Sequence, residues 1–72
     1  MAMPKLPGVP HLRAVRALEK AGFVLIRQGK HIILSNGLRT VQVPRNNPVN
    51  AYTMARIIRD AGLTIDEFKQ WL

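Results

Sequence analysis

Few residues of this 72-residue chain can move a proton near neutral pH: two histidines and four acidic residues, with no cysteine. His31 is the best placed of them, because it follows Gly29 and Lys30 at the expected start of a strand. An imidazole there can accept or deliver a proton. The cations of Arg27 and Lys30 could hold a phosphate beside it and stabilise charge that develops on it. The spacing predicts proton transfer beside a bound phosphate, and the alternative is an ordinary polar residue next to a turn.

The other titratable residues have structural explanations. His11 stands in the first turn of an expected helix and is predicted to be an exposed surface residue. Asp66 and Glu67 stand in the first turn of another helix, where the helix dipole favours acidic side chains. The lack of cysteine excludes a disulfide scaffold, a cysteine-ligated zinc site and a thiol nucleophile. We expect neither a metal nor a cofactor.

The charge of the chain is unevenly distributed. The net charge is +7, and residues 1–59 hold ten of the eleven basic residues against a single acid, Glu19. Such a basic body favours a polyanionic partner, nucleic acid above all, through neutralisation of phosphates and release of their counterions. Four further arginines are interpreted as a basic face flanking His31, namely Arg39, Arg45, Arg56 and Arg59, and the first three are candidate phosphate-binding residues. The alternative for each arginine is a solvated surface residue.

Hydrophobic periodicity predicts two amphipathic helices and a short terminal one. The first spans residues 10–21, with a buried face made of Leu12, Val15 and Leu18. The second begins after a plausible N-cap, Asn50, and ends at Gly62. Thr64 and Glu67 match the capping box that opens the terminal helix. The aromatic residues are spaced as packing residues: Phe23, Tyr52, Phe68 and Trp71.

Three short strands are expected between the two long helices. Residues 23–28 are apolar enough to form a strand buried largely on both faces, and residues 31–34 and 38–43 form the next two. Asn36-Gly37, between the second and third strands, is a strong hairpin signal because both residues tolerate positive φ. The short connections predict an antiparallel meander.

The order α-β-β-β-α plus a short C-terminal helix predicts a two-layer α+β domain, in which both long helices cover one face of a three-stranded antiparallel sheet. Double-stranded-RNA-binding domains use this layout. Residues 1–9, with two prolines, are expected to be a mobile leader, and residues 10–72 a single domain. Because the sequence has neither a secretory signal nor an apolar stretch of membrane-spanning length, we expect a cytoplasmic protein with no membrane association.

Four segments resemble the HicA-like toxins of bacterial type II toxin–antitoxin systems, which are small basic mRNA interferases. The segments are LEKAGF at 18–23, RQGKH at 27–31, VQVP at 41–44 and TMARIIRDAGL at 53–63. Their order and spacing over most of a short chain carry the resemblance. Two positions depart from the family: Lys30 replaces a serine or threonine, and Asn46 stands where a second histidine is common.

The resemblance implies a double-stranded-RNA-binding-like fold, RNA cleavage by a histidine that maps onto His31, and neutralisation by a HicB-like antitoxin. We therefore predict a toxin that is a metal-independent RNA endonuclease acting on mRNA. His31 would take the proton of a ribose 2′-hydroxyl, while Lys30 and Arg27 stabilise charge on the phosphate. The alternatives are a non-catalytic RNA-binding module of the same fold and a protein-interaction domain. Whether the chain forms a homo-oligomer is left open.

Overall fold

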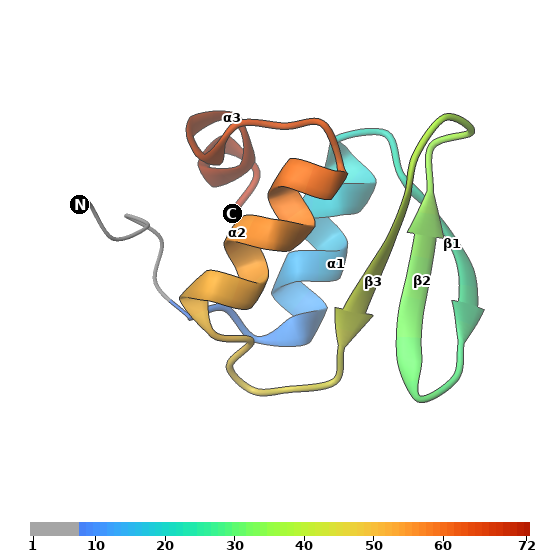
Figure 1. Ribbon diagram of the computed structural model, residues 1–72, viewed down its shortest axis with the longest axis horizontal. Helices are drawn as coiled ribbons and strands as arrows, with labels where there is room; N and C mark the ends of the chain where they lie inside the picture. Colours follow the sequence, from blue (N-terminus) through green and yellow to red (C-terminus); the bar gives the residue numbers. More distant parts are fainter. Residues whose placement is uncertain (1–7) are drawn as a thin grey trace.

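The structure is a computed structural model that describes residues 8–72, and its helices and strands follow the order that the sequence predicts. They are α1 (His11–Lys20), β1 (Val24–Gln28), β2 (His31–Ser35), β3 (Thr40–Pro44), α2 (Ala51–Asp60) and α3 (Ile65–Gln70). The helices lie on one side and the sheet on the other (Figure 1). The predicted two-layer α+β fold is therefore confirmed.

Local contacts explain where the last two helices begin and end. Asn50 Oδ1 accepts the backbone N–H of Thr53 at 2.8 Å and caps α2, as predicted. Thr64 and Glu67 form the predicted capping box at the start of α3. Just past α2, Gly62 has a φ of +76°, a left-handed conformation that costs residues with a Cβ atom energy. These short-range contacts fix the boundaries of both helices.

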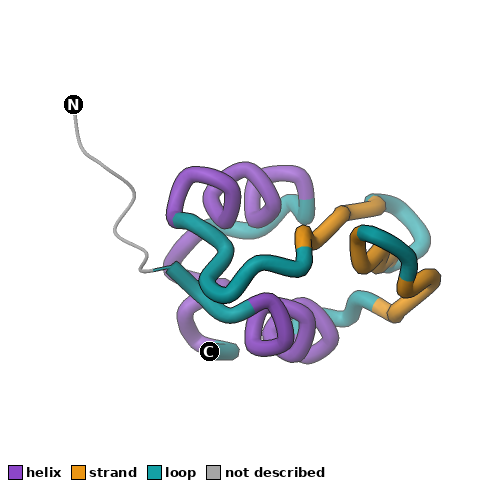
Figure 2. Tube along the Cα trace, turned by 90° about the horizontal axis from the view of Figure 1, so that it is seen from below, coloured by secondary structure: helices purple, strands orange, loops and turns teal. Residues whose placement is uncertain are grey.

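The sheet is antiparallel, with the strand order β1-β2-β3. Side chains alternate between its two faces, and all the helices lie to one side of the strands (Figure 2). The covered face carries buried residues of β2 and β3: Ile32, Leu34, Val41 and Val43. They join one core with the largest buried side chains of the helices, namely Leu18, Met54, Ile58 and Phe68. Within residues 8–72 no helix covers the opposite face, which is therefore open.

Strand β1 is not buried on both faces, so this prediction is wrong. Val24 and Ile26 are 63% and 62% exposed, and Leu25 is only half-buried. The reason is the place of β1 in the sheet: it is an edge strand of a sheet whose second face is open. A bulge between Leu25 and Arg27 also puts Ile26 outside the regular pairing with β2.

Two residues predicted to pack in the core are exposed instead. Leu12 is 60% exposed because the buried stripe of α1 is centred on Ala14 and Leu18. Two residues correspond to about 200° around a helix, so Leu12 lies on the far side from Ala14. Tyr52, in the first turn of α2, is 62% exposed, whereas Met54, two positions later, faces the core.

The chain joins the packed body at Val9. Val9 is buried and forms an antiparallel bridge with Val49, with N–O distances of 3.0 and 2.7 Å. The packed part therefore starts before Pro10, the boundary predicted from the sequence. The rest of the predicted leader, residues 1–7, lies outside the described residues. No helix in 8–72 is long and apolar enough to cross a membrane.

Candidate functional site

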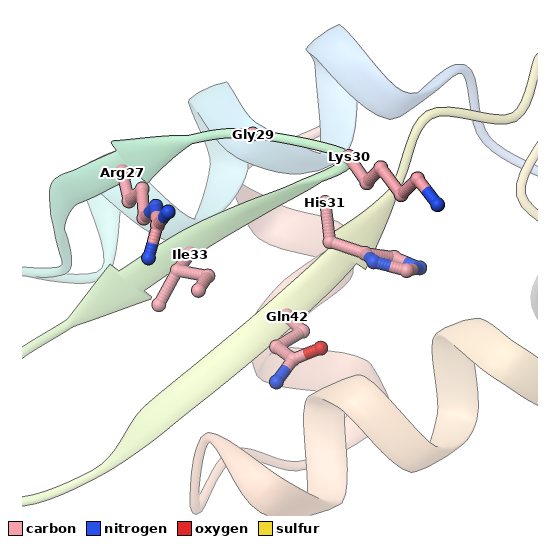
Figure 3. Close-up of a pocket in the computed structure, with 6 residues that line it drawn as sticks. All are labelled: Arg27, Gly29, Lys30, His31, Ile33 and Gln42. Carbon is pink, nitrogen blue, oxygen red and sulfur yellow. The ribbon is translucent and has the colours of Figure 1, made fainter.

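The open face of the sheet is hollowed where β1 turns into β2 (Figure 3). The hollow has a volume of about 310 Å³ and is lined by Arg27, Gly29, Lys30, His31, Ile33 and Gln42. The strand register explains this grouping. Ile33 of β2 is paired with Arg27 of β1 and with Gln42 of β3. Because side chains two positions apart share a face, His31 lies on the same face as Ile33.

His31 is exposed, and neither nitrogen of its ring hydrogen-bonds to another residue of the described chain. The side chains of Arg27 and Lys30 are also exposed and make no hydrogen bond or ion pair within residues 8–72. Figure 3 shows Arg27 over β1 and Lys30 at the turn, with the imidazole of His31 next to Lys30. The imidazole, with both nitrogens free to meet a substrate, thus shares one hollow with two free cations: Lys30 lies beside it, and Arg27 lies beyond Ile33.

Arg45 holds the turn that carries His31. Its Nε donates a hydrogen bond to the carbonyl oxygen of Gly29 at 3.0 Å. Arg45 directly follows Pro44, which is the partner of His31 in the pairing of β2 with β3. The loop after β3 is therefore tied to the β1–β2 turn. Of the five N–H groups of the guanidinium, this bond uses one, and the side chain stays exposed beside the hollow.

Arg56 lines a second hollow, between β3 and α2. This hollow has a volume of about 270 Å³ and is lined by Thr40, Val41, Gln42, Arg56, Ile57 and Asp60. Gln42 lines both hollows, so the two are neighbours on the surface. The structure therefore places Arg56 next to the His31 hollow, on the other side of Gln42.

Arg39 lies at the other end of the sheet, next to the β2–β3 turn. Its Nη1 donates to the carbonyl oxygen of Asp60 at 3.4 Å. Its guanidinium also lies over Gly62, where an added Cβ atom would come within 2.7 Å of Nε. A cation at the C-terminal end of α2 interacts favourably with the helix dipole. The structure thus brings Arg27, Lys30 and His31 together but leaves Arg39 with a different partner.

The matched part of the sequence spans both hollows. Residues 13–63 match the family described as HicA toxin of bacterial toxin–antitoxin systems. The chain belongs to the HicA toxin family. It is accordingly the toxin of a toxin–antitoxin system, and membership implies a cognate antitoxin as its partner. No curated protein and no solved structure matches the chain.

The HicA-family match confirms the resemblance and contains every predicted site residue, whereas His11 lies before it. His11 was predicted to be exposed, but it is half-buried, and its Nδ1 lies 2.8 Å from Asn47 Oδ1. Within residues 8–72, no three histidine or acidic side chains come close enough together to hold a metal ion.

Gln42 is the residue of this HicA-family site that the sequence analysis missed. A signal for it exists, because Gln42 stands between Val41 and Val43, whose burial turns the intervening side chain to the open face. The sequence does not show that β3 lies beside β2 in a register that brings Gln42 near His31, because that register is a property of the folded sheet.

Proposed function

We propose that this HicA-family toxin is an RNA endonuclease that acts on mRNA, with His31 as the general base. The observation that carries the proposal is the imidazole of His31, free at both nitrogens, in an open hollow that is also lined by two free cations, Arg27 and Lys30. A net charge of +7 supports a polyanionic substrate, since each neutralised phosphate releases counterions.

The reaction uses a nucleophile that RNA itself brings. His31 takes the proton of a ribose 2′-hydroxyl, O2′ forms a bond to the adjacent phosphorus, and the bond from phosphorus to O5′ breaks. The products are a 2′,3′-cyclic phosphate and a 5′-hydroxyl. Arg27 and Lys30 offset the negative charge that builds up on the phosphate oxygens. The leaving O5′ takes its proton from Lys30 or from solvent water, since the hollow is open to both. No step of this route calls for a metal ion.

The test is cleavage of a defined RNA by the purified chain, with analysis of the new ends. The proposal expects 2′,3′-cyclic phosphates, cleavage that persists in EDTA, and loss of cleavage in His31→Ala. Cleavage retained by His31→Ala, or abolished by EDTA, contradicts the mechanism. Circular dichroism of the variant shows whether the fold is kept, and it should be, because His31 is exposed.

We further propose that the antitoxin is HicB-like and covers the His31 hollow with an acidic or apolar surface, since charge complementarity guides such pairing. Expression of the chain alone should arrest growth, and co-expression of an acidic neighbouring open reading frame should restore it. A bound antitoxin should also protect RNA from cleavage. If a rescuing partner leaves RNA cleavage by the purified complex unchanged, it does not cover this hollow.

A second candidate function is an RNA-binding module without catalysis. It is favoured by one observation: within residues 8–72 no group hydrogen-bonds to the ring of His31 and orients it, whereas catalytic histidines are commonly held by a second group. This candidate predicts RNA binding that weakens steeply with salt, with no cleavage and no growth arrest. The same experiments therefore separate the two functions.

A further inference from the structure

The second hollow lies between α2 and the free edge of β3, the strand nearest the helices in Figure 1. Two buried side chains, Val41 and Ile57, each 3% exposed, form its apolar floor. Its other lining residues are exposed and polar: Thr40, Gln42, Arg56 and Asp60. The volume of about 270 Å³ is slightly below that of pockets for drug-sized ligands, about 300–1,000 Å³. A flat group of nucleobase size suits such a floor.

Backbone groups of β3 also face this hollow. Antiparallel pairs alternate between residues that bond each other and residues whose N–H and C=O groups point outwards. The N–H of Asn36 donates to the carbonyl oxygen of Arg39 at 3.1 Å, so this pair is of the bonded kind. Thr40 and Gln42 lie one and three positions beyond Arg39 in a regular register. Their backbone N–H and C=O groups therefore point away from β2. Their backbone donors and acceptors face the free edge.

Gln42 connects the second hollow to the first. It lies on the open face of the sheet with His31 and lines both hollows (Figure 3). An RNA strand whose reacting phosphate lies at His31 and Lys30 would thus place a neighbouring nucleotide beside Gln42. From there its base can enter the space between β3 and α2.

We propose that the second hollow binds a guanine base next to the phosphate that is cleaved at His31, an inference that rests on the proposed function. Arg56 and Asp60 are four residues apart on α2 and so lie on the same helix face. Arginine pairs in bidentate fashion with the O6 and N7 acceptors of guanine. An ionised carboxylate only accepts hydrogen bonds, and the N1–H and N2 amine of guanine offer it two adjacent donors.

Guanine is the base that satisfies both side chains at once. Adenine turns its N1 acceptor towards the carboxylate, and cytosine and uracil lack the N7 acceptor. The carboxylate of Asp60 is available for this role, because its ion pair with Arg59 is long, at 3.9 Å, and joins side chains that are 78% and 53% exposed. Contacts of this kind are how proteins select unstacked bases in single-stranded RNA.

The first experiment maps cleavage sites of the full chain on an RNA of mixed sequence. Guanine should stand at one fixed position beside the cleaved bond. In a short oligoribonucleotide, replacing that guanine with inosine removes the N2 donor, and 7-deazaguanine removes the N7 acceptor. Each replacement should lower kcat/KM about five- to tenfold. Equal cleavage next to all four bases, or a fixed preference for another base, overturns the assignment.

Variants assign the two contacts to their side chains. Asp60→Asn should abolish the preference for guanine over inosine and leave the preference over 7-deazaguanine. Arg56→Ala should do the reverse. Arg16→Ala is the matched control, because it removes the same charge from an exposed position of α1 that lines neither hollow. It should leave both preferences unchanged. A loss in Arg16→Ala equal to that in Arg56→Ala would mean that the preference depends on net charge and not on a contact from Arg56.

Binding to the His31→Ala chain separates this inference from the proposed function. If the wild-type chain cleaves no RNA but the His31→Ala chain binds the guanine oligonucleotide about five- to tenfold more tightly than the inosine one, the base site stands and the endonuclease proposal fails. If RNA is cleaved and Arg56→Ala and Asp60→Asn change neither preference, the endonuclease stands and the base site fails.

Discussion

At both ends of its sheet the protein has an arginine that hydrogen-bonds to a backbone carbonyl oxygen, but the two arginines serve different purposes. At the β1–β2 end, Arg45 donates to Gly29 at 3.0 Å and steadies a turn. The side chains on that turn, Lys30 and His31, remain exposed and without partners in the described chain. Here the arginine supports a surface that is left open to a substrate.

At the β2–β3 end, Arg39 donates to Asp60 at 3.4 Å and lies over Gly62. Its contacts join the hairpin to the end of α2. Arg39 and Arg45 have the same apparent role in the sequence. In the folded protein Arg45 supports a binding surface, whereas Arg39 holds two elements of the structure together.

The largest effect is expected from His31→Ala, which should slow RNA cleavage by about 10²–10⁴-fold, the usual contribution of general acid–base catalysis. His11→Ala is the matched control, because His11 lines neither hollow, and it should change the rate by less than about twofold. Initial rates on a fluorescent oligoribonucleotide measure both. Cleavage by His31→Ala at more than a tenth of the wild-type rate would show that His31, at the β1–β2 end, is not the general base.

Next in size is Gly62→Ala, which should lower the free energy of unfolding by about 1–3 kcal/mol. The φ of +76° disfavours a side chain, and the new Cβ would collide with Arg39. Gly29→Ala at the other end is the control. Its Cβ would meet only Arg27 Nε, at 3.9 Å, so stability should change by less than about 0.5 kcal/mol. Urea denaturation of both variants is the measurement. Equal losses of unfolding free energy in the two variants would show that the two ends of the sheet do not differ in this respect.

A smaller effect is expected when Arg27 and Arg39 are each replaced by alanine. Arg27→Ala should lower kcat/KM about tenfold, because it removes a charge-assisted contact to phosphate, and should leave stability unchanged. Arg39→Ala should do the opposite: kcat/KM within about twofold of wild type and a loss of up to about 1 kcal/mol in unfolding free energy, the worth of a typical hydrogen bond. If Arg39→Ala instead weakens cleavage as much as Arg27→Ala does, the basic face extends along the whole sheet.

The smallest effect concerns Arg45. Arg45→Ala removes one hydrogen bond to the turn and should lower kcat about threefold, within the worth of a single such bond. Arg45→Lys keeps the charge but loses the Nε–H that reaches Gly29, so it should be as slow as Arg45→Ala. A full rescue by lysine would mean that Arg45 acts through its charge and not by holding the turn.

The helix ends and turns could be predicted from the sequence because their causes are local. Asn50, the Thr64 and Glu67 pair and Asn36-Gly37 act on backbone groups within a few residues. The grouping of Arg27, Lys30 and His31 was predictable for the same reason, since one tight turn joins the end of β1, which carries Arg27, to the start of β2, which carries His31.

The predictions that were wrong concern features that depend on residues far apart in the chain. The exposure of β1 follows from its edge position, which residues 23–28 do not encode by themselves. The hydrogen-bond partner of Arg39 is 21 residues away in the sequence, and that of Arg45 is 16 residues away. The residues next to each arginine therefore do not show whether it makes a structural contact or belongs to a binding surface. The same holds for Gln42, which lines one hollow with Arg56 only because α2 packs beside β3.

The bulge at Ile26 has a consequence for association between copies of the chain. A sheet with two edges offers two templates on which a further strand could add, and natural proteins blunt such edges. The bulge interrupts β1 in its middle, leaving only two regularly paired residues on either side, and α2 lies beside the edge of β3. One face of the sheet can therefore stay open to a substrate, while neither edge offers a regular strand on which further copies could add.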